Sequence, residues 1–536
     1  MTVLLALTLM SSGMQLLWFG SKAIHQIDYD GMAYTRIAMD LKLGHFRDSL
    51  NAFRSPLISW LIAIMPGGDL VHTGKVVTIL TFCCTEILLY AFTLALWRSH
   101  SAAALAVFLF TLARGVGFLT VAFVTPDFLL AALVLAYFLA LLHHLRKGQG
   151  RWFLAGTMHG AAFLSKAIAL PWLAVCTCVA AALSGGSWRQ RIIRVGSAAI
   201  VPLLVAIFWG SALHAKYGVF TIGSQFKANL LQWTLRGVAP RPASKYRVLT
   251  DVAPQTAQGL GADPMPPDSW EWSYHPPVAS VVSRVAHAEL QNLPKALKEI
   301  VILTTPGGVL AFLIVGILLA KRPDTAEGVL AITVAIGAVA LVLAYSMLVV
   351  DSRYFFPLLV LFLAFASIFL LPEATKYLPF ASPVLRLICI VLVLSGTIFS
   401  LTYWASPMRV QTRDWQEVCY QTGASLARRN VKTVVSVGSG PFPEHGVGWE
   451  AGYTSSYFGD ARLLAASVAV PEDTQDLLLD VGQAAPDAVI IWDTDARRRE
   501  IVQDALRSDY PSGQVITDSK IGEAGTILYR DQASPR

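Results

Sequence analysis

Charged residues are scarce in this chain. Only 14% of its 536 residues are Asp, Glu, Lys or Arg, and 55% are hydrophobic, whereas soluble domains carry about 25% charged residues. This composition excludes an ordinary soluble globular protein. Many apolar runs approach the roughly 20 residues that cross the hydrocarbon layer of a membrane. Because backbone groups cannot hydrogen-bond to lipid, such runs form helices. The sequence therefore predicts a polytopic membrane protein.

Cysteine is scarce as well. Five of the six cysteines lie within apolar runs, and only Cys419 lies in the less hydrophobic C-terminal part. A lone cysteine excludes a disulfide within that part, and Cys176 and Cys178 lack the Cys-x-x-Cys spacing of a redox or zinc site. We therefore expect the cysteines to serve in packing.

Eleven apolar runs are predicted to span the membrane. The first lacks the basic start and the small-residue cleavage site of a signal peptide, so we interpret it as a helix of the protein. The runs are Thr2–Phe19, Val71–Trp97, Ala102–Val124, Phe128–His144, Trp152–Ala169, Trp172–Leu183, Val195–His214, Leu297–Ala320, Gly328–Val350, Tyr354–Leu371 and Val384–Trp404.

Lysine and arginine residues set the expected orientation, because they gather in cytoplasmic connectors. This pattern puts the opposite connectors, and everything after Trp404, on the extracytoplasmic side of the cell inner (plasma) membrane. It also accounts for the net charge of +7 without a nucleic-acid partner. The basic residues fall in alternate connectors: Arg98; Arg146, Lys147 and Arg151; Arg189, Arg191 and Arg194; Lys321 and Arg322; Lys376 and Arg386.

The predicted fold is an all-α polytopic membrane bundle of about 11 transmembrane helices over residues 1–404, with outer loops at 21–70 and 215–296. In the second loop we expect interfacial helices, because Phe226, Leu230 and Leu235 recur at helical spacing. Trp233, Trp270, Trp272 and Tyr274 suit the headgroup zone, and a proline-rich turn is expected at 264–267.

A small α/β extracytoplasmic domain is expected over residues 405–536. Two helices and three buried strands are predicted there. The turn at 437–440, Val-Gly-Ser-Gly, follows a strand but lacks a complete phosphate-loop pattern, so we interpret it as a plain turn. The predicted helices are Trp415–Arg428 and Gln475–Val481, and the predicted strands are Val431–Val437, Ala488–Trp492 and Thr526–Tyr529.

Two carboxylates stand just beyond the first apolar run, in Ile27-Asp28-Tyr29-Asp30. On a helix, residues two apart diverge by about 200°, so Asp28 and Asp30 act together only where the chain turns. We expect Asp30 to precede a short amphipathic helix over Gly31–Leu43 that lies in the interface plane. The alternative is that Asp30 only caps this helix.

Other ionisable residues are predicted at the same outer level. Asp127 begins a span, Lys166 lies near the outer end of another, Arg353 opens a third, and Arg54 follows the amphipathic helix. Each has a plain structural alternative in capping, snorkelling, anchoring or headgroup binding. Together they supply a carboxylate that accepts a proton from a hydroxyl and cations that stabilise a phosphate leaving group. Transfer of a sugar from a lipid phosphate needs this set of groups.

Four motifs, in this order, resemble those of GT-C glycosyltransferases of the protein O-mannosyltransferase and lipid A aminoarabinose transferase superfamily. Those enzymes read Asp-Glu-Ala-x-Tyr followed by Arg-Pro-Pro-Leu, then Thr/Ala-Pro-Asp, Phe-Leu-Thr-Lys and Arg-Tyr-x-Leu-Pro. The resemblance covers roughly Thr2 to Trp404. The motifs here are Asp30-Gly31-Met32-Ala33-Tyr34 followed by Arg54-Ser55-Pro56-Leu57, Thr125-Pro126-Asp127, Phe163-Leu164-Ser165-Lys166 and Arg353-Tyr354-Phe355-Phe356-Pro357.

The resemblance implies particular roles. The implied donor is a polyprenyl-phosphate monosaccharide, the implied reaction is inverting, and the acceptor is a hydroxyl of an envelope glycan, a lipid or a protein. The family's second acid is replaced by Gly31 here, so Asp28 is its candidate substitute. The implied site comprises Asp30 as catalytic base and Asp127 as second acid, with Arg54, Lys166, Arg353 and Tyr354 at the donor phosphate.

Two questions stay open at this point. The first is whether Asp28 and Asp127 hold a divalent metal ion, because the replacement at Gly31 removes an acid that the family carries. The second is whether the protein is instead a multi-span transporter or lipid-linked-sugar flippase without chemistry. Transporters usually bind substrate near the midplane and show internal repeats, whereas here the charges gather at the outer ends and the Asp28–Leu57 segment does not recur.

Overall fold

The structure is a computed structural model that forms two compact units. The first unit comprises Met1–Lys22, Ile37–Ala239 and Met265–Ala405, and the second comprises Ala23–Arg36, Pro240–Pro264 and Ser406–Arg536. The residues that the structure describes are 2–20, 25–113, 116–147, 152–235, 247, 249–251, 277–348, 350–377, 382–405, 414–438, 448–467, 474–493, 495–518 and 522–530.

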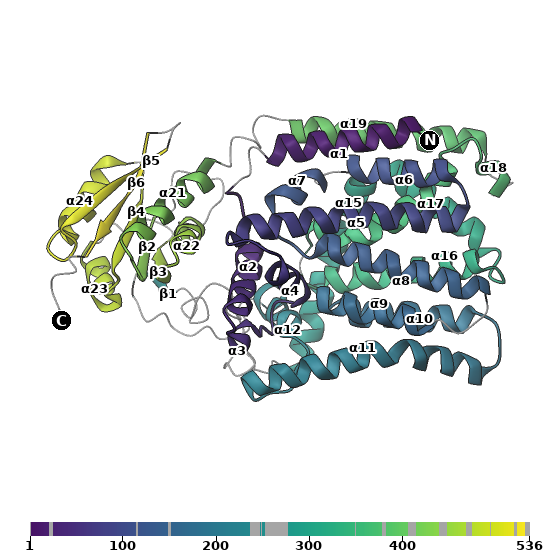
Figure 1. The fold of residues 1–536 in the computed structure, drawn as a ribbon, viewed down its shortest axis with the longest axis horizontal. Coiled ribbons are helices and arrows are strands. Elements are labelled where there is room, and N and C mark those ends of the chain that lie inside the picture. Colours follow the sequence, from purple (N-terminus) through teal and green to yellow (C-terminus); the bar gives the residue numbers. More distant parts are fainter. Residues whose placement is uncertain are drawn as a thin grey trace. The chain divides into compact units, whose positions relative to one another are not determined.

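The first unit is a bundle of helices that run side by side (Figure 1). The helix α2, Tyr29–Lys42, contributes its first half to the second unit and its second half to this one. The other elements of the first unit are α1 (Thr2–Gly20), α3 (Phe46–Ser49), α4 (Leu57–Ile64), α5 (Leu70–Trp97), α6 (His100–Leu112), α7 (Val116–Ala122), α8 (Asp127–Lys147), α9 (Trp152–Ser165), α10 (Ala169–Leu183), α11 (Trp188–Tyr217), α12 (Gln225–Asn229), the π-helix η1 (Leu230–Thr234), α15 (Val278–Ala320), α16 (Ala326–Ser346), the 3-10 helix η2 (Ser352–Phe355), α17 (Phe356–Phe369), α18 (Ala374–Tyr377) and α19 (Pro383–Ala405).

The chain is a multi-pass membrane protein. Within the described ranges, five helices are long and apolar enough to cross a membrane: α5, α8, α11, α16 and the stretch Ser352–Phe369. The two halves of α15, Val278–Thr304 and Pro306–Ala320, make a sixth span if they are counted together. The expected total of about eleven therefore stays a prediction, because the apolar helices of α1, α6, α10 and α19 are shorter.

Breaks in two helices interrupt the expected spans. The run Ala102–Val124 is not one helix, because α6 ends at Leu112 and Ala113 takes an extended conformation with ψ 146°. The helix α15 bends by 97° at Thr305, whose φ is +65°. At this bend α19 comes so close that a Cβ on Gly396 would lie 2.7 Å from the Cβ of Thr305. Glycine at position 396 thus permits the close approach of the two helices.

The core of the bundle lies around α17. All of its 14 residues are buried, which explains why its sequence is apolar on every side. Trp97 at the end of α5 donates from its Nε1 to the carbonyl of Ala364 at 2.8 Å. Phe312 of α15 stacks on Phe362 with 3.9 Å between ring centroids. These contacts fix α17 between α5 and α15.

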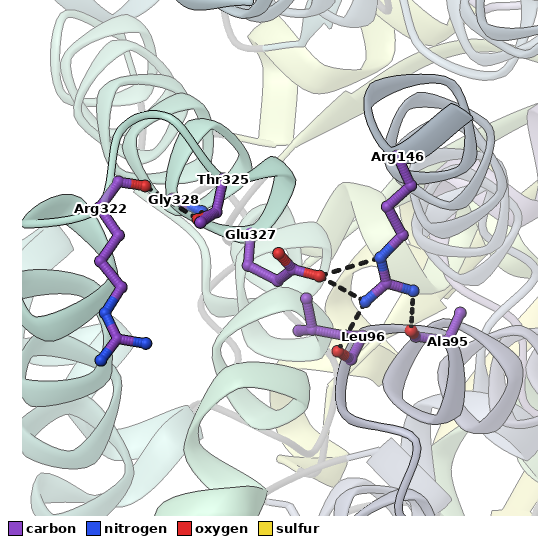
Figure 2. A network of polar contacts seen from close by, with 7 residues as sticks. All are labelled: Ala95, Leu96, Arg146, Arg322, Thr325, Glu327 and Gly328. Atoms are coloured by element: carbon purple, nitrogen blue, oxygen red, sulfur yellow. Dashed lines mark hydrogen bonds and ion pairs between the residues drawn. The ribbon is translucent and has the colours of Figure 1, made fainter. Parts of the chain in front are cut away.

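A network of polar contacts links the ends of α5 and α8 to the start of α16 (Figure 2). Arg146 of α8 donates to Glu327 of α16 at 2.9 Å from Nε and at 2.6 Å from Nη2. Its guanidinium also donates to the carbonyls of Ala95 and Leu96, in the last turn of α5. The cation therefore satisfies helix-end carbonyls that have no partner within their own helix.

The second unit is built on a six-stranded sheet in the order β1-β3-β2-β4-β6-β5. The neighbours β3, β2 and β4 are parallel, and the other pairs are antiparallel. The near-continuous apolar sequences of β2 and β4 are typical of strands buried on both faces. The strands are β1 (Thr250–Asp251), β2 (Thr433–Val437), β3 (Arg462–Ser467), β4 (Ala488–Trp492), β5 (Ser512–Asp518) and β6 (Gly522–Tyr529).

Helices cover both faces of this sheet (Figure 1). The α23 and α24 side chains join the cluster around Val435, Val437, Val489 and Ile491. Since side chains alternate along a strand, Ser436 points to the other face, where a Cβ on Gly452 of α22 would lie 2.3 Å from it. The helices are α21 (Asp414–Arg428), α22 (Gly448–Phe458), α23 (Thr474–Ala484) and α24 (Ala496–Leu506).

Several predicted elements can be compared directly with the structure. The predicted strands are confirmed as β2, β4 and β6, the predicted helices as α21 and α23, and the helix expected after Asp30 as α2. The expected helices near Phe226 and Leu230 are α12 and η1. The turn at 264–267, the aromatic residues at 270–274 and residues 439–440 lie outside the described residues.

Candidate functional site

A buried ion pair joins the start of α8 to the turn between α9 and α10. Asp127 is 1% exposed, and its Oδ1 accepts from the Lys166 amine while its Oδ2 accepts from the Thr125 hydroxyl. Lys166 is placed there because α9 ends at Ser165 and α10 begins at Ala169. Buried charges persist when they are paired and hydrogen-bonded. The pair therefore holds a fixed cation at the end of the bundle.

Two tyrosines lie beside this cation. The Lys166 Nζ is 4.4 Å from the centroid of the Tyr354 ring, within the range of a cation–π contact. Tyr354 belongs to η2, and its ring stacks on that of Tyr345 with 4.7 Å between centroids and an interplanar angle of 16°. Tyr345 lies in the last turn of α16. Three separate parts of the sequence thus surround one amine.

Arg353 adds a second cation to the same group. Its guanidinium carbon lies 5.6 Å from the centroid of the Tyr354 ring. Its Nε donates to Asp351 Oδ2 at 3.1 Å, and Asp351 Oδ1 accepts from the Arg353 backbone N–H at 3.1 Å. Asp351 therefore both caps η2 and orients the arginine. Among the predicted site residues, the structure brings Asp127, Lys166, Arg353 and Tyr354 together.

A cavity of about 220 Å³ opens beside these residues. Ligand pockets for whole drug-sized molecules usually measure about 300–1,000 Å³, so this one fits a headgroup or a short piece of chain. Its wall combines polar groups with apolar side chains, as an amphiphile requires. The lining residues are Lys166, Ala167, Ile168, Pro171, Ile222, Gly223, Gln225, Phe226, Asn229, Ala344, Tyr345, Leu348 and Tyr354.

The loop that carries Arg54 lies next to the cavity wall. The carbonyl of Ala52 accepts from the backbone N–H of Ser224 at 2.7 Å, and Ser224 follows the lining residue Gly223. Arg54 is 6% exposed, and its guanidinium carbon lies 4.7 Å from the centroid of the Phe53 ring. The loop therefore links Arg54 to the cavity wall. Among the described residues, those that line the cavity do not include Arg54 itself.

A second amine lies on the helix that lines the cavity. Lys227 of α12 follows the lining residue Phe226, and partial burial lowers its pKa from the ordinary value for lysine. Burial disfavours the charged form of an amine. An anion bound nearby would oppose this effect and favour the ammonium form.

Asp28 and Asp30 belong to the second unit. Asp28 Oδ1 accepts from the Gly31 N–H at 3.0 Å, and its carbonyl accepts from the Met32 N–H at 2.9 Å. Asp28 is therefore the N-cap of α2. Asp30 lies in the first turn of the helix, where the helix dipole favours a negative charge. The capping role considered for Asp30 thus falls to Asp28.

The described residues show no ligand set that fits a divalent metal ion. No group of three or more His, Cys, Asp or Glu side chains that could hold a metal occurs in the described ranges. Both oxygens of Asp127 are engaged, by the Lys166 amine and the Thr125 hydroxyl. A lysine already occupies the cationic position beside this carboxylate, so no metal is assigned to Asp28 or Asp127.

Sequence reasoning missed Tyr345, Gln225 and Asn229. Gln225 and Asn229 lie four residues apart on α12, on the same side of the helix. Tyr345 is the one tyrosine in the apolar sequence of α16, and a polar tip at the end of an apolar span was the available signal. None of the three belongs to a motif, so their grouping with Lys166 depended on the packing.

Comparison with known proteins concerns the fold. No protein-family model and no curated protein sequence matches the chain. The structure is similar to that of ArnT from Cupriavidus metallidurans bound to undecaprenyl phosphate, with a TM-score of 0.53 and 11% identity over 98% of this chain and 99% of that one. The apo state of the same ArnT gives 0.52 and 12% over the same shares.

A second solved structure with a similar fold is the oligosaccharyltransferase of Archaeoglobus fulgidus in its apo form. Its TM-score is 0.50 and its identity 12%, over 99% of this chain and 75% of that one. ArnT and this oligosaccharyltransferase are GT-C glycosyltransferases. The expected GT-C-like fold is thereby confirmed, and identities this low establish the fold alone.

Proposed function

We propose that this protein is a membrane glycosyltransferase that moves a monosaccharide from a polyprenyl-phosphate donor to an acceptor hydroxyl on the extracytoplasmic face. The observation that carries the proposal is the cavity beside the buried Asp127–Lys166 pair, where a fixed cation meets an apolar wall. A phosphate on a prenyl chain has the matching chemistry. The ArnT structure, which has the same fold, contains undecaprenyl phosphate.

In the proposed complex the donor phosphate lies against the Lys166 amine and the Tyr354 hydroxyl, with Arg353 and Arg54 as further cations. The prenyl chain lies along the apolar part of the cavity wall. Asp127 keeps Lys166 in place through their ion pair. Negative charge that builds on the leaving phosphate is then stabilised by groups already oriented for it.

The proposed base is Asp30. Its carboxylate takes the proton of the acceptor hydroxyl, and the oxygen attacks the anomeric carbon from the face opposite the phosphate. The bond between that carbon and the phosphate oxygen breaks, and its electron pair leaves with the phosphate. The product has inverted configuration. A general acid, which glycosidases require, is unnecessary because the leaving group is already a phosphate. The proposal assigns Asp28 to capping α2.

The proposal also includes the arrangement in the membrane. Residues 1–404 would form the catalytic membrane domain of the inner (plasma) membrane, with about eleven spans, and residues 405–536 an extracytoplasmic domain. The cation-rich connectors support this orientation, since they would face the cytoplasm. The acceptor would be an envelope glycan, a lipid or an exported protein.

The test is transfer of a labelled sugar. Purified protein is incubated with a panel of labelled polyprenyl-phosphate sugars and an envelope extract, and the destination of the label is followed. Asp30→Asn should abolish transfer and leave donor binding intact. Asp48→Asn is the matched control, because Asp48 is an exposed acid of the same outer loop and should transfer at the normal rate.

Two outcomes would count against the proposal. Turnover at the wild-type rate in Asp30→Asn would remove Asp30 from the role of base. If no donor yields a transferred sugar, but the protein moves labelled lipid across the bilayer of proteoliposomes, a flippase without chemistry replaces the glycosyltransferase.

A further inference from the structure

The segment that carries Asp30 is held by the C-terminal part of the chain. Gln416 of α21 makes two hydrogen bonds to the backbone of Ile27, which is 389 positions away in the sequence. The Ile27 N–H donates to Gln416 Oε1 at 2.9 Å, and Gln416 Nε2 donates to the Ile27 carbonyl at 3.1 Å. Both residues are buried. One amide side chain thus satisfies both backbone groups of the residue just before the cap of α2.

Further contacts hold the two sides of this segment. After Asp30, the Thr35 hydroxyl lies 2.6 Å from the Tyr457 hydroxyl, and Arg36 donates to Asp460 Oδ1 at 2.8 Å. Before Ile27, the His25 Nδ1 lies 2.5 Å from Glu417 Oε2. The His25 ring also stacks on the Tyr420 ring, with 3.7 Å between centroids. These residues all belong to the second unit.

The same unit also holds part of the long outer loop. Asp480 of α23 accepts from the backbone N–H groups of Arg247 at 3.1 Å and Leu249 at 3.0 Å. Arg247 pairs with Asp476 at 2.8 Å, and the strand β1 that follows extends the sheet beside β3. Leu249 is buried in the core of the sheet. Residues of the C-terminal sequence therefore contact parts of both outer loops.

The attachment lies three residues before Asp30 in the sequence. Asp28 caps α2 and Asp30 lies in its first turn, so a shift of Ile27 displaces the cap and the first turn together. Misplacing a reacting group by about 1 Å lowers a rate by roughly 100-fold. An effect of Gln416 on Asp30 would therefore pass through the backbone of Ile27.

We propose that the C-terminal part of the second unit, Ser406–Arg536, is a clamp that positions the proposed base, with Gln416 as its central positioning residue. This inference rests on the proposed function for the role of Asp30. The attachment itself rests on the hydrogen bonds of Ile27, Thr35 and Arg36. Contacts with phosphate are assigned to other residues, so the clamp should affect turnover and not donor binding.

The first test separates turnover from binding. Gln416→Ala should lower kcat on the order of 10- to 100-fold and leave the KM for the polyprenyl-phosphate sugar unchanged, because Lys166 and Tyr354 are untouched. The matched control is Gln503→Ala, which removes a hydrogen bond to Thr526 within the same unit. This control should keep the wild-type kcat. An unchanged kcat in Gln416→Ala would overturn the clamp.

The second test needs no activity. Hydrogen–deuterium exchange at the amides of residues 27–36 should become roughly 30-fold faster in Gln416→Ala, the effect of the two lost hydrogen bonds. It should stay at the wild-type rate in Gln503→Ala. Equal exchange in the two variants would refute the attachment, whether or not a sugar is transferred. Absence of transfer in the wild type would instead refute the proposed function.

The fold of each variant is checked at Cys419. Burial raises the pKa of this thiol to about 12, so an alkylating reagent at pH 8 should leave it unmodified while the second unit is folded. If Gln416→Ala exposes Cys419, both tests are repeated with Tyr457→Phe. This substitution removes only the hydroxyl that contacts Thr35. A Tyr457→Phe variant with normal kcat and normal exchange would then overturn the clamp.

Discussion

Replacing Lys166 by methionine should weaken both the fold and donor binding. Lys166→Met keeps a long side chain but removes the amine. Of the two observed partners of the buried Asp127 carboxylate, the Thr125 hydroxyl then remains. Breaking a buried pair on one side costs about 3–5 kcal/mol of unfolding free energy. A charge-assisted hydrogen bond to the donor phosphate contributes about 1.5–3 kcal/mol. Its loss weakens the affinity for polyprenyl phosphate roughly 10- to 150-fold.

The double variant separates these two effects. Asp127→Asn combined with Lys166→Met replaces the pair by neutral groups, so most of the stability should return while donor affinity stays low. Thermal unfolding in detergent measures the stability, and binding of undecaprenyl phosphate measures the affinity. Lys298→Met, at an exposed lysine of α15, is the control. The reasoning fails if Lys166→Met binds the lipid phosphate normally, or if the double variant regains full affinity.

Two further predictions concern the arginines. Arg353→Ala should weaken donor binding or turnover. Arg353→Lys should keep part of the binding and turnover, because a cation remains beside Tyr354. If both variants were as active as the wild type, Arg353 would be an interface anchor. Arg146→Ala should lower the unfolding free energy by about 2 kcal/mol, since Glu327 and two carbonyls lose their donor. Donor affinity should not change in Arg146→Ala, because Arg146 lies about 30 Å along α8 from Asp127, and a changed affinity would contradict this.

The sequence predicts the helices and their order well, because apolar length is a local property. The motif residues Asp127, Lys166, Arg353 and Tyr354 could also be grouped in advance, since each lies at the end of an apolar run. The breaks at Ala113 and Thr305 were not foreseen. They depend on backbone conformations that hydrophobicity does not report.

Contacts between distant parts of the sequence were the harder problem. Nothing near Ile27 indicates that Gln416 satisfies its backbone, and no pattern marks the two-residue strand β1 as a partner of β3. From the sequence, only Asp30 was considered as a cap, whereas the structure gives this role to Asp28, and the two side chains are chemically equivalent as caps. Only the fold decides which of the two carboxylates faces the free N–H groups of α2.

The central claim is that the cavity beside Lys166 takes the phosphate of a polyprenyl donor. The most direct measurement is an electron-microscopy structure of the protein with undecaprenyl phosphate. The account predicts the phosphate within hydrogen-bonding distance of Lys166 Nζ, with the prenyl chain along Phe226 and Leu348. A phosphate bound elsewhere, with this cavity empty, would contradict it.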